Sequence, residues 1–290
     1  MAEADNESPI HFDLGYNMQH HPRGLAIIFN NERFEKMANR TGTRIDRDKL
    51  YTTFKNLGFE VHVFDDYTAN RISDVLLKAG RFDHSDFDCF LCVFLTHGDE
   101  GIIYGSDGDP DSFKSDGNVN STSRTWLLLN DDVFDIFRGS NCRSLIGKPK
   151  IFIIQACRGG KAEIPSQAVP LGAPAKDFET SAGVRVTIPT EADFLISYSS
   201  SDGYFSIREL YKGTWFIQDL SRVLNQFGNK EDFVQMLTVV NKLVSERTLE
   251  VPGNPEPEER KQMPCFLSKL TRQLRLTDQQ SGYFSNCQIM

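Results

Sequence analysis

Short apolar runs alternate with amphipathic stretches along most of the chain. Residues 24–29 and 89–95 are almost continuously apolar, which is typical of strands buried on both faces of a parallel sheet. Leu50, Phe54 and Leu57 recur at helical spacing, and Gly58 follows as a stop signal. The whole pattern predicts strands at 24–29, 59–64, 89–95, 150–154, 194–198 and 265–270, and helices at 46–57, 72–79, 215–227 and 231–246. This alternation predicts an α/β sandwich around a mostly parallel sheet.

Three polar stretches interrupt this alternation. Residues 106–125 are rich in Asp, Gly, Ser and Asn, and we expect an exposed insertion there. Residues 159–182 contain prolines among small residues without periodicity, which is typical of a linker. Residues 252–260 are rich in Pro and Glu and predict a loop. These stretches divide the chain into segments. The sequence contains no internal repeat.

The composition is that of an ordinary soluble globular protein, with 39% hydrophobic and 25% charged residues among 290. No apolar run approaches the roughly 20 residues that span a bilayer, and the N-terminus lacks the regions of a signal peptide. We therefore expect a cytoplasmic protein. The net charge of −8 argues against nucleic acid or a membrane surface as a general partner.

Six cysteines are present, and three of them, Cys89, Cys92 and Cys157, lie in apolar, strand-like runs. A small buried hydrophobic residue is the simplest interpretation of such a cysteine. Cys89 and Cys92 form a CxxC pair, but no second pair or paired histidine completes a zinc-binding set. Because cytosolic thiols are kept reduced, we expect no disulfide framework, and we expect neither a metal nor a cofactor.

Two predicted strands end in reactive side chains. The run that ends at Leu95 is followed by Thr96, His97 and Gly98, and the run that ends at Ile154 is followed by residues 155–159 (QACRG). Functional groups gather at the carboxyl ends of strands in open α/β sheets. If these strands are neighbours, a thiol meets an imidazole, the minimum for nucleophilic catalysis by cysteine. On position alone, a buried cysteine and an incidental histidine explain the pattern equally well.

The local motifs resolve this ambiguity, because residues 155–159 match the caspase signature. Further blocks resemble the same family in the same order, over about residues 23–276. These blocks are residues 40–43 (RTGT), 95–101 (LTHGDEG), 147–150 (GKPK), 192–195 (ADFL), 203–208 (GYFSIR) and 213–218 (GTWFIQ). The chain therefore resembles a caspase of the effector type with a short prodomain. The resemblance implies a caspase-like three-layer sandwich in which helices flank a mostly parallel six-stranded sheet.

The resemblance also implies roles for individual residues. Cys157 attacks the scissile carbonyl, His97 assists the leaving amine, and the main-chain N–H groups of Gly98 and Cys157 form the oxyanion hole. The pocket for a substrate aspartate is lined by Arg40, Gln155 and Arg208. A guanidinium group offers forked donors that match a carboxylate, so paired arginines suit this pocket physically.

The peptide is expected to lie along residues 205–209 as an added strand, in contact with Phe205, Ser206, Ile207 and Glu209. Trp215 either forms an apolar wall for more distant substrate residues or is a core aromatic of a helix. Ile207 replaces the usual tryptophan of the family, which predicts a wider pocket for the residue before the aspartate. Glu209 replaces the asparagine of many effector members and predicts a weaker preference for acid three positions before the cleaved aspartate.

The resemblance implies a zymogen with five segments. These are a prodomain at 1–20, a large-subunit region at 21–158, a linker at 159–187, a small-subunit region at 188–276 and a tail at 277–290. Asp177 is the expected linker cleavage site, although Phe178 after it is bulky, and Asp5 and Asp13 are expected prodomain sites. Cleavage by an upstream protease would give a homodimer of two large and two small subunits. The tail ends in a C-a-a-X pattern at Cys287, and only its prenylation would bring the protein to a membrane.

Two alternatives remain at this stage. A paracaspase or metacaspase cleaves after Arg or Lys and needs an acidic pocket, which Arg40 and Arg208 argue against. A catalytically inactive caspase-like regulator that binds active caspases typically lacks the cysteine or the histidine, whereas Cys157 and His97 are both present. The resemblance thus favours a cysteine endopeptidase that acts on protein substrates after aspartate, with a role in apoptosis.

Overall fold

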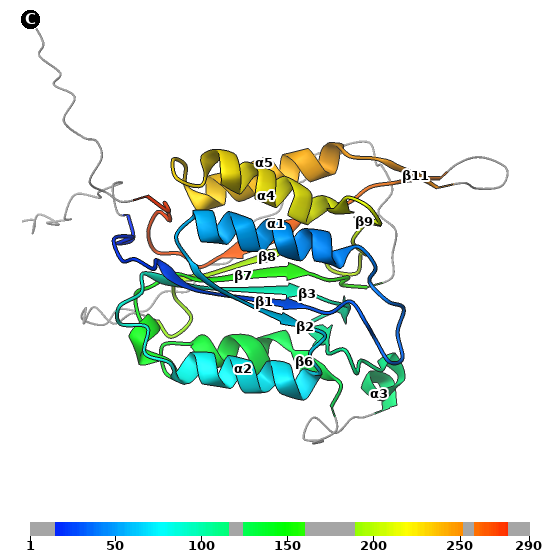
Figure 1. Ribbon diagram of the computed structural model, residues 1–290, viewed down its shortest axis with the longest axis horizontal. Helices are drawn as coiled ribbons and strands as arrows, with labels where there is room; N and C mark the ends of the chain where they lie inside the picture. Colours follow the sequence, from blue (N-terminus) through cyan, green and yellow to red (C-terminus); the bar gives the residue numbers. More distant parts are fainter. Residues whose placement is uncertain (1–14, 116–123, 160–188, 252–257, 278–290) are drawn as a thin grey trace, which may run out of the picture.

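The computed structural model describes residues 15–115, 124–159, 189–251 and 258–277. Its main sheet has six strands in the order β13-β8-β7-β3-β1-β2 (Figure 1). The first five strands along the chain pair in parallel and β13 pairs antiparallel to β8. These strands are β1 (Gly24–Asn30), β2 (Glu60–Asp65), β3 (Cys89–Leu95), β7 (Lys150–Gln155), β8 (Phe194–Tyr198) and β13 (Cys265–Ser268). The six strands predicted from the apolar runs are confirmed, and the last ends two residues early.

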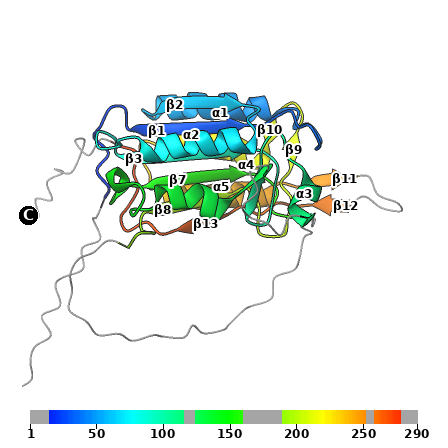
Figure 2. The same ribbon diagram turned by 90° about the horizontal axis from the view of Figure 1, so that it is seen from below.

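Helices cover both faces of this sheet and complete a three-layer sandwich (Figures 1 and 2). One face carries α1 (Thr43–Asn56), α4 (Trp215–Phe227) and α5 (Phe233–Glu246). The other carries α2 (Ala69–Arg81) with η1 (Leu129–Phe134) and η2 (Asp135–Phe137). The predicted caspase-like sandwich is therefore confirmed.

The two faces of the sheet bury separate hydrophobic clusters, because successive strand residues point to opposite sides. In β3, Cys89 belongs to the cluster under α1, α4 and α5, and Cys92 belongs to the cluster under α2. The CxxC spacing therefore separates the two thiols by the thickness of the sheet, and burial raises the pKa of both. Aromatic rings pack the second cluster, with Phe90 stacked 4.3 Å from Phe137.

Several short elements were not predicted from the sequence. A small sheet joins β4 (Gly98–Asp99), β5 (Ile102–Tyr104) and β6 (Trp126–Leu128). Helix α3 (Pro110–Ser115) forms within residues 106–125, which were expected to be an exposed insertion. Gly108, just before this helix, is buried, so this part of the stretch packs against the domain. The hairpin of β11 (Leu249–Val251) and β12 (Glu258–Arg260) replaces part of the loop expected at 252–260. Elements of two or three residues carry too short a pattern to recognise.

Residues just before position 20 pack against the folded domain. Tyr16 and Met18 are buried, and the Tyr16 hydroxyl donates to Asp193 Oδ1 at 2.6 Å. Gly15 also forms a bridge with Gln273. These contacts hold the start of the described chain against the folded domain, while the prodomain boundary at residue 20 stays a prediction. Within the described ranges, no helix has the length and apolar character needed to cross a bilayer.

Candidate active site

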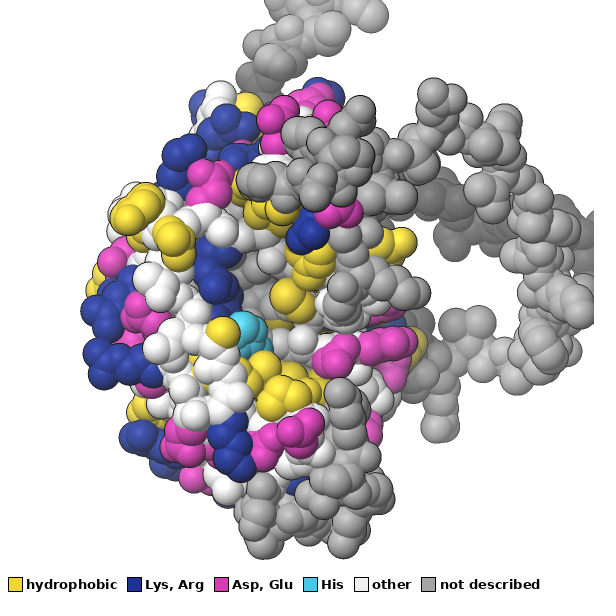
Figure 3. All heavy atoms as spheres, turned by 90° about the vertical axis from the view of Figure 1, so that its right-hand side faces the viewer, with side chains coloured by type: hydrophobic (Ala, Val, Ile, Leu, Met, Phe, Trp, Pro, Cys, Tyr) yellow, Lys and Arg dark blue, Asp and Glu magenta, His cyan; other side chains and the backbone are white. Residues whose placement is uncertain are grey.

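The central strands end at the same level, which brings their following residues together. Asn30 of β1 pairs with Leu95 of β3, and Leu95 pairs with Gln155 of β7. His97 and Cys157 therefore follow neighbouring strands by two residues each, so the condition stated for a thiol and an imidazole to meet is fulfilled. Figure 3 views this face of the molecule and shows it hollowed near its centre, where histidine atoms lie beside Lys and Arg side chains.

One cavity of about 280 Å³ gathers most of the expected functional residues. It is lined by Arg40, Thr96, His97, Gln155, Ala156, Cys157, Ser206 and Arg208. The first six of these precede residues 160–188 in the chain, and the last two follow them. The cavity thus combines a thiol, an imidazole, an amide and two guanidinium groups.

The imidazole of His97 is fixed by a main-chain carbonyl. His97 Nε2 lies 2.8 Å from the Ala38 oxygen, so Nε2 carries the hydrogen and donates it, which leaves Nδ1 as the basic nitrogen. The Phe34 ring packs against the imidazole with centroids 4.6 Å apart. Burial, with Arg40 and Arg208 nearby, lowers the pKa of His97 to about 4 against the opposing Ala38 hydrogen bond. His97 is therefore neutral in the free protein at pH 7.

This environment makes the titration of His97 a direct prediction. Above pH 5 the ring should stay neutral, because adding a proton places a third positive charge beside the two arginines. In a histidine NMR titration, the His97 signal, identified by its loss in His97→Gln, should therefore not shift between pH 5 and 8. A midpoint near the ordinary value of about 6.5 would contradict the burial and charge argument.

Gly98 allows His97 and Cys157 to approach each other. A Cβ atom at Gly98 would lie 2.9 Å from Ala156 Cβ and 3.0 Å from the Cys157 carbonyl oxygen. Such contacts are shorter than van der Waals distance, so any larger residue would push the cysteine segment away. The glycine thus brings the main chain of β4 against the segment of Cys157.

The two arginines of the cavity come from opposite parts of the chain and are held by different groups. Arg40, which is 2% exposed, donates through one nitrogen to the Asn31 oxygen at 3.2 Å and to Thr43 Oγ1 at 2.9 Å. Arg208 donates through Nε to the Thr41 oxygen at 3.2 Å. Burial and the neighbouring Arg208 lower the pKa of Arg40 to about 9, and burial lowers the pKa of Arg208. Both groups remain charged at pH 7 and form a positive, partly dehydrated pocket.

Gln155, the last residue of β7, links this strand to the expected peptide-binding segment. Its amide Nε2 donates to Ser206 Oγ at 2.7 Å, while Oε1 is buried without a partner among the described residues. A half-turn of this amide would let the Ser206 hydroxyl donate to the oxygen and would present the NH₂ group to a bound carboxylate. The residue therefore has one hydrogen-bonding end available for a ligand.

Four further residues expected at the substrate site lie outside this cavity. Ile207 is 5% exposed and packs in the core cluster under α1, α4 and α5, so its side chain faces away from the cavity. Trp215 is 4% exposed and belongs to the same cluster, which fits the alternative of a core aromatic. Phe205 is partly buried and packs against this cluster. Glu209 accepts from Trp215 Nε1 at 2.9 Å and pairs with Lys212 at 3.0 Å. None of these four side chains lines the cavity that contains Cys157, so their predicted contacts with substrate stay predictions.

Asp5, Asp13, Asp177 and Cys287 lie outside the described residues, so their predicted roles rest on sequence alone.

Sequence reasoning missed the residues that support the reactive groups. Ala38 acts through its main-chain carbonyl, which no side-chain pattern can reveal. Gln262 is buried; its Oε1 accepts from the Ile207 N–H at 2.7 Å and its Nε2 donates to the Ser199 oxygen at 2.7 Å. Its only sequence signal is a polar residue beside a predicted edge strand.

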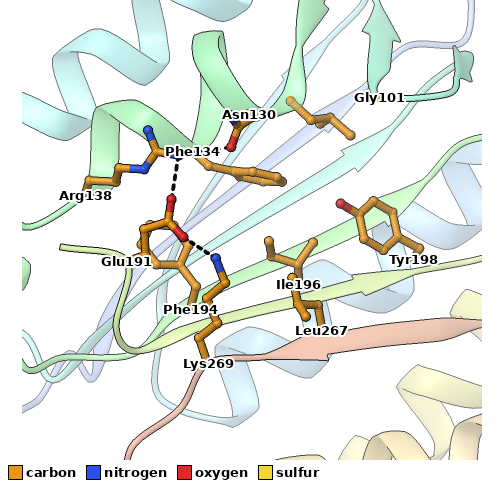
Figure 4. Close-up of a pocket in the computed structure, with 11 residues that line it drawn as sticks. Gly101, Asn130, Phe134, Arg138, Glu191, Phe194, Ile196, Tyr198, Leu267 and Lys269 are labelled. Atoms are coloured by element: carbon orange, nitrogen blue, oxygen red, sulfur yellow. Dashed lines mark hydrogen bonds and ion pairs between the residues drawn. The ribbon is translucent and has the colours of Figure 1, made fainter. Parts of the chain in front are cut away.

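A second cavity, of about 250 Å³, lies beside β8 and β13 (Figure 4). Glu191 there pairs with Arg138 at 3.0 Å and with Lys269, over a floor that includes Phe134 and Ile196. Glu191 is thus held between two cations, and no cysteine or histidine lines the cavity. Across the described parts of the chain, no cluster of three acidic, histidine or cysteine side chains could hold a metal ion. Of these two cavities, only the first is lined by a cysteine and a histidine, so it is the candidate for nucleophilic chemistry.

Comparison with known proteins agrees with this arrangement. Residues 23–275 match the caspase domain family model. The chain is 41% identical to caspase-6 of Bos taurus over 273 residues, which cover 90% of this chain and 86% of the relative. It is 40% identical to caspase-7 of Gallus gallus over 263 residues, which cover 89% of this chain and 79% of the relative. The chain belongs to the caspase family.

Proposed function

We propose that this chain is an endopeptidase that cleaves proteins after aspartate, with Cys157 as its nucleophile, and that it acts as an effector caspase made as a zymogen. The observation that carries this proposal is the single cavity in which Cys157 and His97 lie with Arg40 and Arg208. A thiol and an imidazole supply the nucleophile and the base, and the two guanidinium groups select a substrate with an acidic side chain. Neither pair alone would specify the activity.

In the proposed reaction, the Cys157 thiol gives its proton to His97 Nδ1 as its sulfur bonds to the scissile carbonyl carbon. The oxyanion takes hydrogen bonds from the N–H groups of Gly98 and Cys157. His97 then passes the proton to the leaving amine, and a thioester remains. Water gives a proton to His97 and attacks the thioester, which releases the new acid and regenerates the thiol.

Substrate binding should itself improve His97 as a base. Arg40 and Arg208 both lower the pKa of His97, and a bound aspartate carboxylate offsets their charge. The pKa of His97 should therefore rise when the correct substrate occupies the pocket. This linkage favours proton transfer from Cys157 only after an acidic side chain has bound.

The test uses a peptide chloromethyl ketone that ends in aspartate, with a matched reagent that ends in lysine. The proposal predicts a covalent adduct on Cys157 with the aspartyl reagent alone, located by mass spectrometry of the digested protein. Equal labelling by the lysyl reagent would refute the specificity. If iodoacetamide alkylates Cys157 while the aspartyl reagent does not, the chain would instead be an inactive family member.

The hydrogen bonds of Ile207 support the proposed addition of the substrate as a strand. Its N–H donates to Gln262 at 2.7 Å, and its carbonyl oxygen accepts from the Trp215 N–H at 3.3 Å. Successive residues of a strand turn their main-chain groups to opposite sides. The groups of Ser206 and Arg208 then face the other way, where an extended peptide can pair with them.

Glu209 is expected to weaken the preference for acid three positions before the cleaved aspartate. Its carboxylate is shared with Lys212 at 3.0 Å and lies 3.9 Å from Arg247, so its repulsion of another acid is partly offset. Glu209→Gln should therefore raise relative cleavage of peptides with acid at that position by only about two- to fivefold, in the range of an exposed charge interaction. A peptide library compared between the two proteins measures this; an unchanged ratio would remove Glu209 from specificity.

We further propose that the active form is a homodimer joined at β13. This strand is the edge of the main sheet, and Leu267 on it is 49% exposed. An unpaired apolar edge favours pairing with another strand. Leu267→Glu should shift the protein toward monomers in sedimentation velocity, whereas an unchanged dimer fraction would place the interface elsewhere.

Cleavage at Asp177 is proposed as the activating event, with Asp5 and Asp13 as further processing sites and Cys287 as a site of prenylation. Mass spectrometry of the active protein identifies the cut positions. An uncut chain with full activity would exclude linker cleavage as the switch, and unchanged membrane fractionation of Cys287→Ser would exclude lipidation.

A further inference from the structure

We propose that ionised Asp46, on the first turns of α1, is a positioning residue that holds the two pocket arginines and the hairpin of Arg208 in one arrangement. This inference rests on the proposed function, because it assigns Asp46 to the recognition of substrate aspartate. Asp46 does not line the cavity. It acts on the residues that do.

The hairpin in question joins β9 (Arg208–Glu209) to β10 (Gly213–Thr214), with Arg208 opposite Thr214. Both carboxylate oxygens of Asp46 accept from the Thr214 N–H, at 2.9 and 3.1 Å. Gly213, with φ of 91°, packs so closely that a Cβ there would lie 2.1 Å from Asp46 Oδ1. The carboxylate therefore fixes the strand that is paired directly with Arg208.

The start of α1 holds the same hairpin at other points. The Thr41 carbonyl accepts from Arg208 Nε at 3.2 Å, and Lys49 Nζ donates to the Lys212 oxygen at 3.3 Å. A Cβ at Gly42 would lie 2.6 Å from the Leu210 oxygen. Arg40 precedes this turn by a few residues, so a single stretch of chain supplies one pocket arginine and anchors the other.

Asp46 is also the counter-charge for this stretch. The negative charge of Asp46 attracts both Arg40 and Arg208. The two arginines repel each other, and the charge of Arg208 lowers the pKa of Arg40. The charged groups that face Asp46 are Arg40, Lys49 and Arg208, all cationic. Removing the negative charge leaves the two guanidinium groups to repel each other in a poorly solvated site. The half-buried Arg208 can then relieve the repulsion by moving toward solvent.

This carboxylate is 0% exposed and is costly to keep ionised. Burial raises the pKa of Asp46 to about 6, against the opposing hydrogen bond from Thr214 and the charge of Arg40. A raised pKa in an acid contributes stability below about pH 4 that is lost as the pH rises through 6. At pH 7, above this pKa, Asp46 is ionised, and its burial lowers the stability of the fold. The neutral amide in Asp46→Asn avoids this destabilisation, so we expect the variant to fold.

The experiment compares Asp46→Asn and Asp46→Ala with Asp48→Asn, a control on the same helix whose side chain is 67% exposed. Steady-state cleavage of an aspartyl peptide and alkylation of Cys157 by iodoacetamide are measured on each. We expect the Asp46 variants to raise KM about tenfold or more, with kcat and the alkylation rate within about threefold of the parent. A folded Asp46→Asn protein with unchanged KM would overturn the proposal.

A second measurement uses the parent protein alone, so that it tests the proposal even when the Asp46 variants do not fold. Binding of a peptide that ends in aspartate amide is followed by fluorescence polarisation from pH 7.5 to 5. The ligand carboxyl and His97 both titrate near pH 4, below this window. Affinity of the parent should be highest above pH 6 and fall below it as Asp46 is protonated. A flat profile would overturn the role of Asp46, whereas a parent protein that binds no aspartyl peptide would overturn the proposed function.

Discussion

Replacing Cys157 with serine is expected to lower kcat for an aspartyl peptide by about 10⁴-fold or more. A serine hydroxyl needs a strong base to become a nucleophile. His97, whose pKa is lowered to about 4, is a weak one. Sulfur loses its proton far more readily, so only the thiol suits this histidine.

The loss in Cys157→Ser should be confined to the chemical step. Binding of an aspartyl peptide amide should stay within about twofold, because Arg40, Gln155 and Arg208 are unchanged. Stopped-time cleavage assays and fluorescence polarisation measure the two quantities on the same preparation. A serine variant that keeps even one hundredth of the parent rate would show that another group is the nucleophile.

Replacing Arg40 with glutamine should produce the second large loss, of about 10²- to 10³-fold in kcat/KM for aspartyl peptides. Truncating one partner of a buried charge pair costs about 2–5 kcal/mol, which corresponds to this range. Arg40→Lys should recover only part of the loss, because an ammonium group keeps the charge without the forked donors. Removing Arg40 should also raise the pKa of His97, since this arginine lowers it.

Arg44→Gln provides the matched control for Arg40. Arg44 is an exposed residue of α1 that pairs with Glu32, and neither residue lines the cavity, so its loss should change kcat/KM by less than twofold. Thermal unfolding of each variant separates lost recognition from lost folding. Equal effects of the two substitutions would mean that Arg40 acts through the stability of α1.

Much of the scaffold could be predicted from the sequence because its central strands are apolar throughout. β3 and β7 are buried along their whole length, so their composition marks them without any partner. Their adjacency, which the sequence left as a condition, is given by the structure and places His97 and Cys157 after neighbouring strands. The order of the strands, however, depends on tertiary pairing that no local pattern encodes.

The predictions were weakest where a residue acts through its surroundings. Ile207 and Trp215 stand in two blocks that resemble the substrate-binding region of the family, and both side chains pack into the core cluster. Period two explains Ile207, because the residues on either side of Ser206 in an extended segment point away from the cavity. Trp215 is instead the first residue of helix α4, which packs against the sheet. Family position alone gives no side-chain direction.

Asp46 carried a sequence signal that periodicity makes visible in retrospect. Asp46, Leu50 and Phe54 follow one another at intervals of four, so the acid occupies the buried face of α1. A charge on the apolar face of a helix needs a partner, and the partner is the main chain of Thr214, 168 residues away. Such a distant contact cannot be read from the sequence.

The parallel pairing of β7 with β8 has a consequence for a protein cut between residues 159 and 189. The two strands share a hydrogen-bonded register from Lys150 opposite Phe194 to Ile154 opposite Tyr198. After such a cut they would belong to separate polypeptides, and Arg208 would sit on a different molecule from Cys157. The active site would then exist only while the two polypeptides stay paired in the sheet. Mild denaturant would abolish activity by separating them, and the denaturant concentration at half-maximal activity would fall when the protein is diluted.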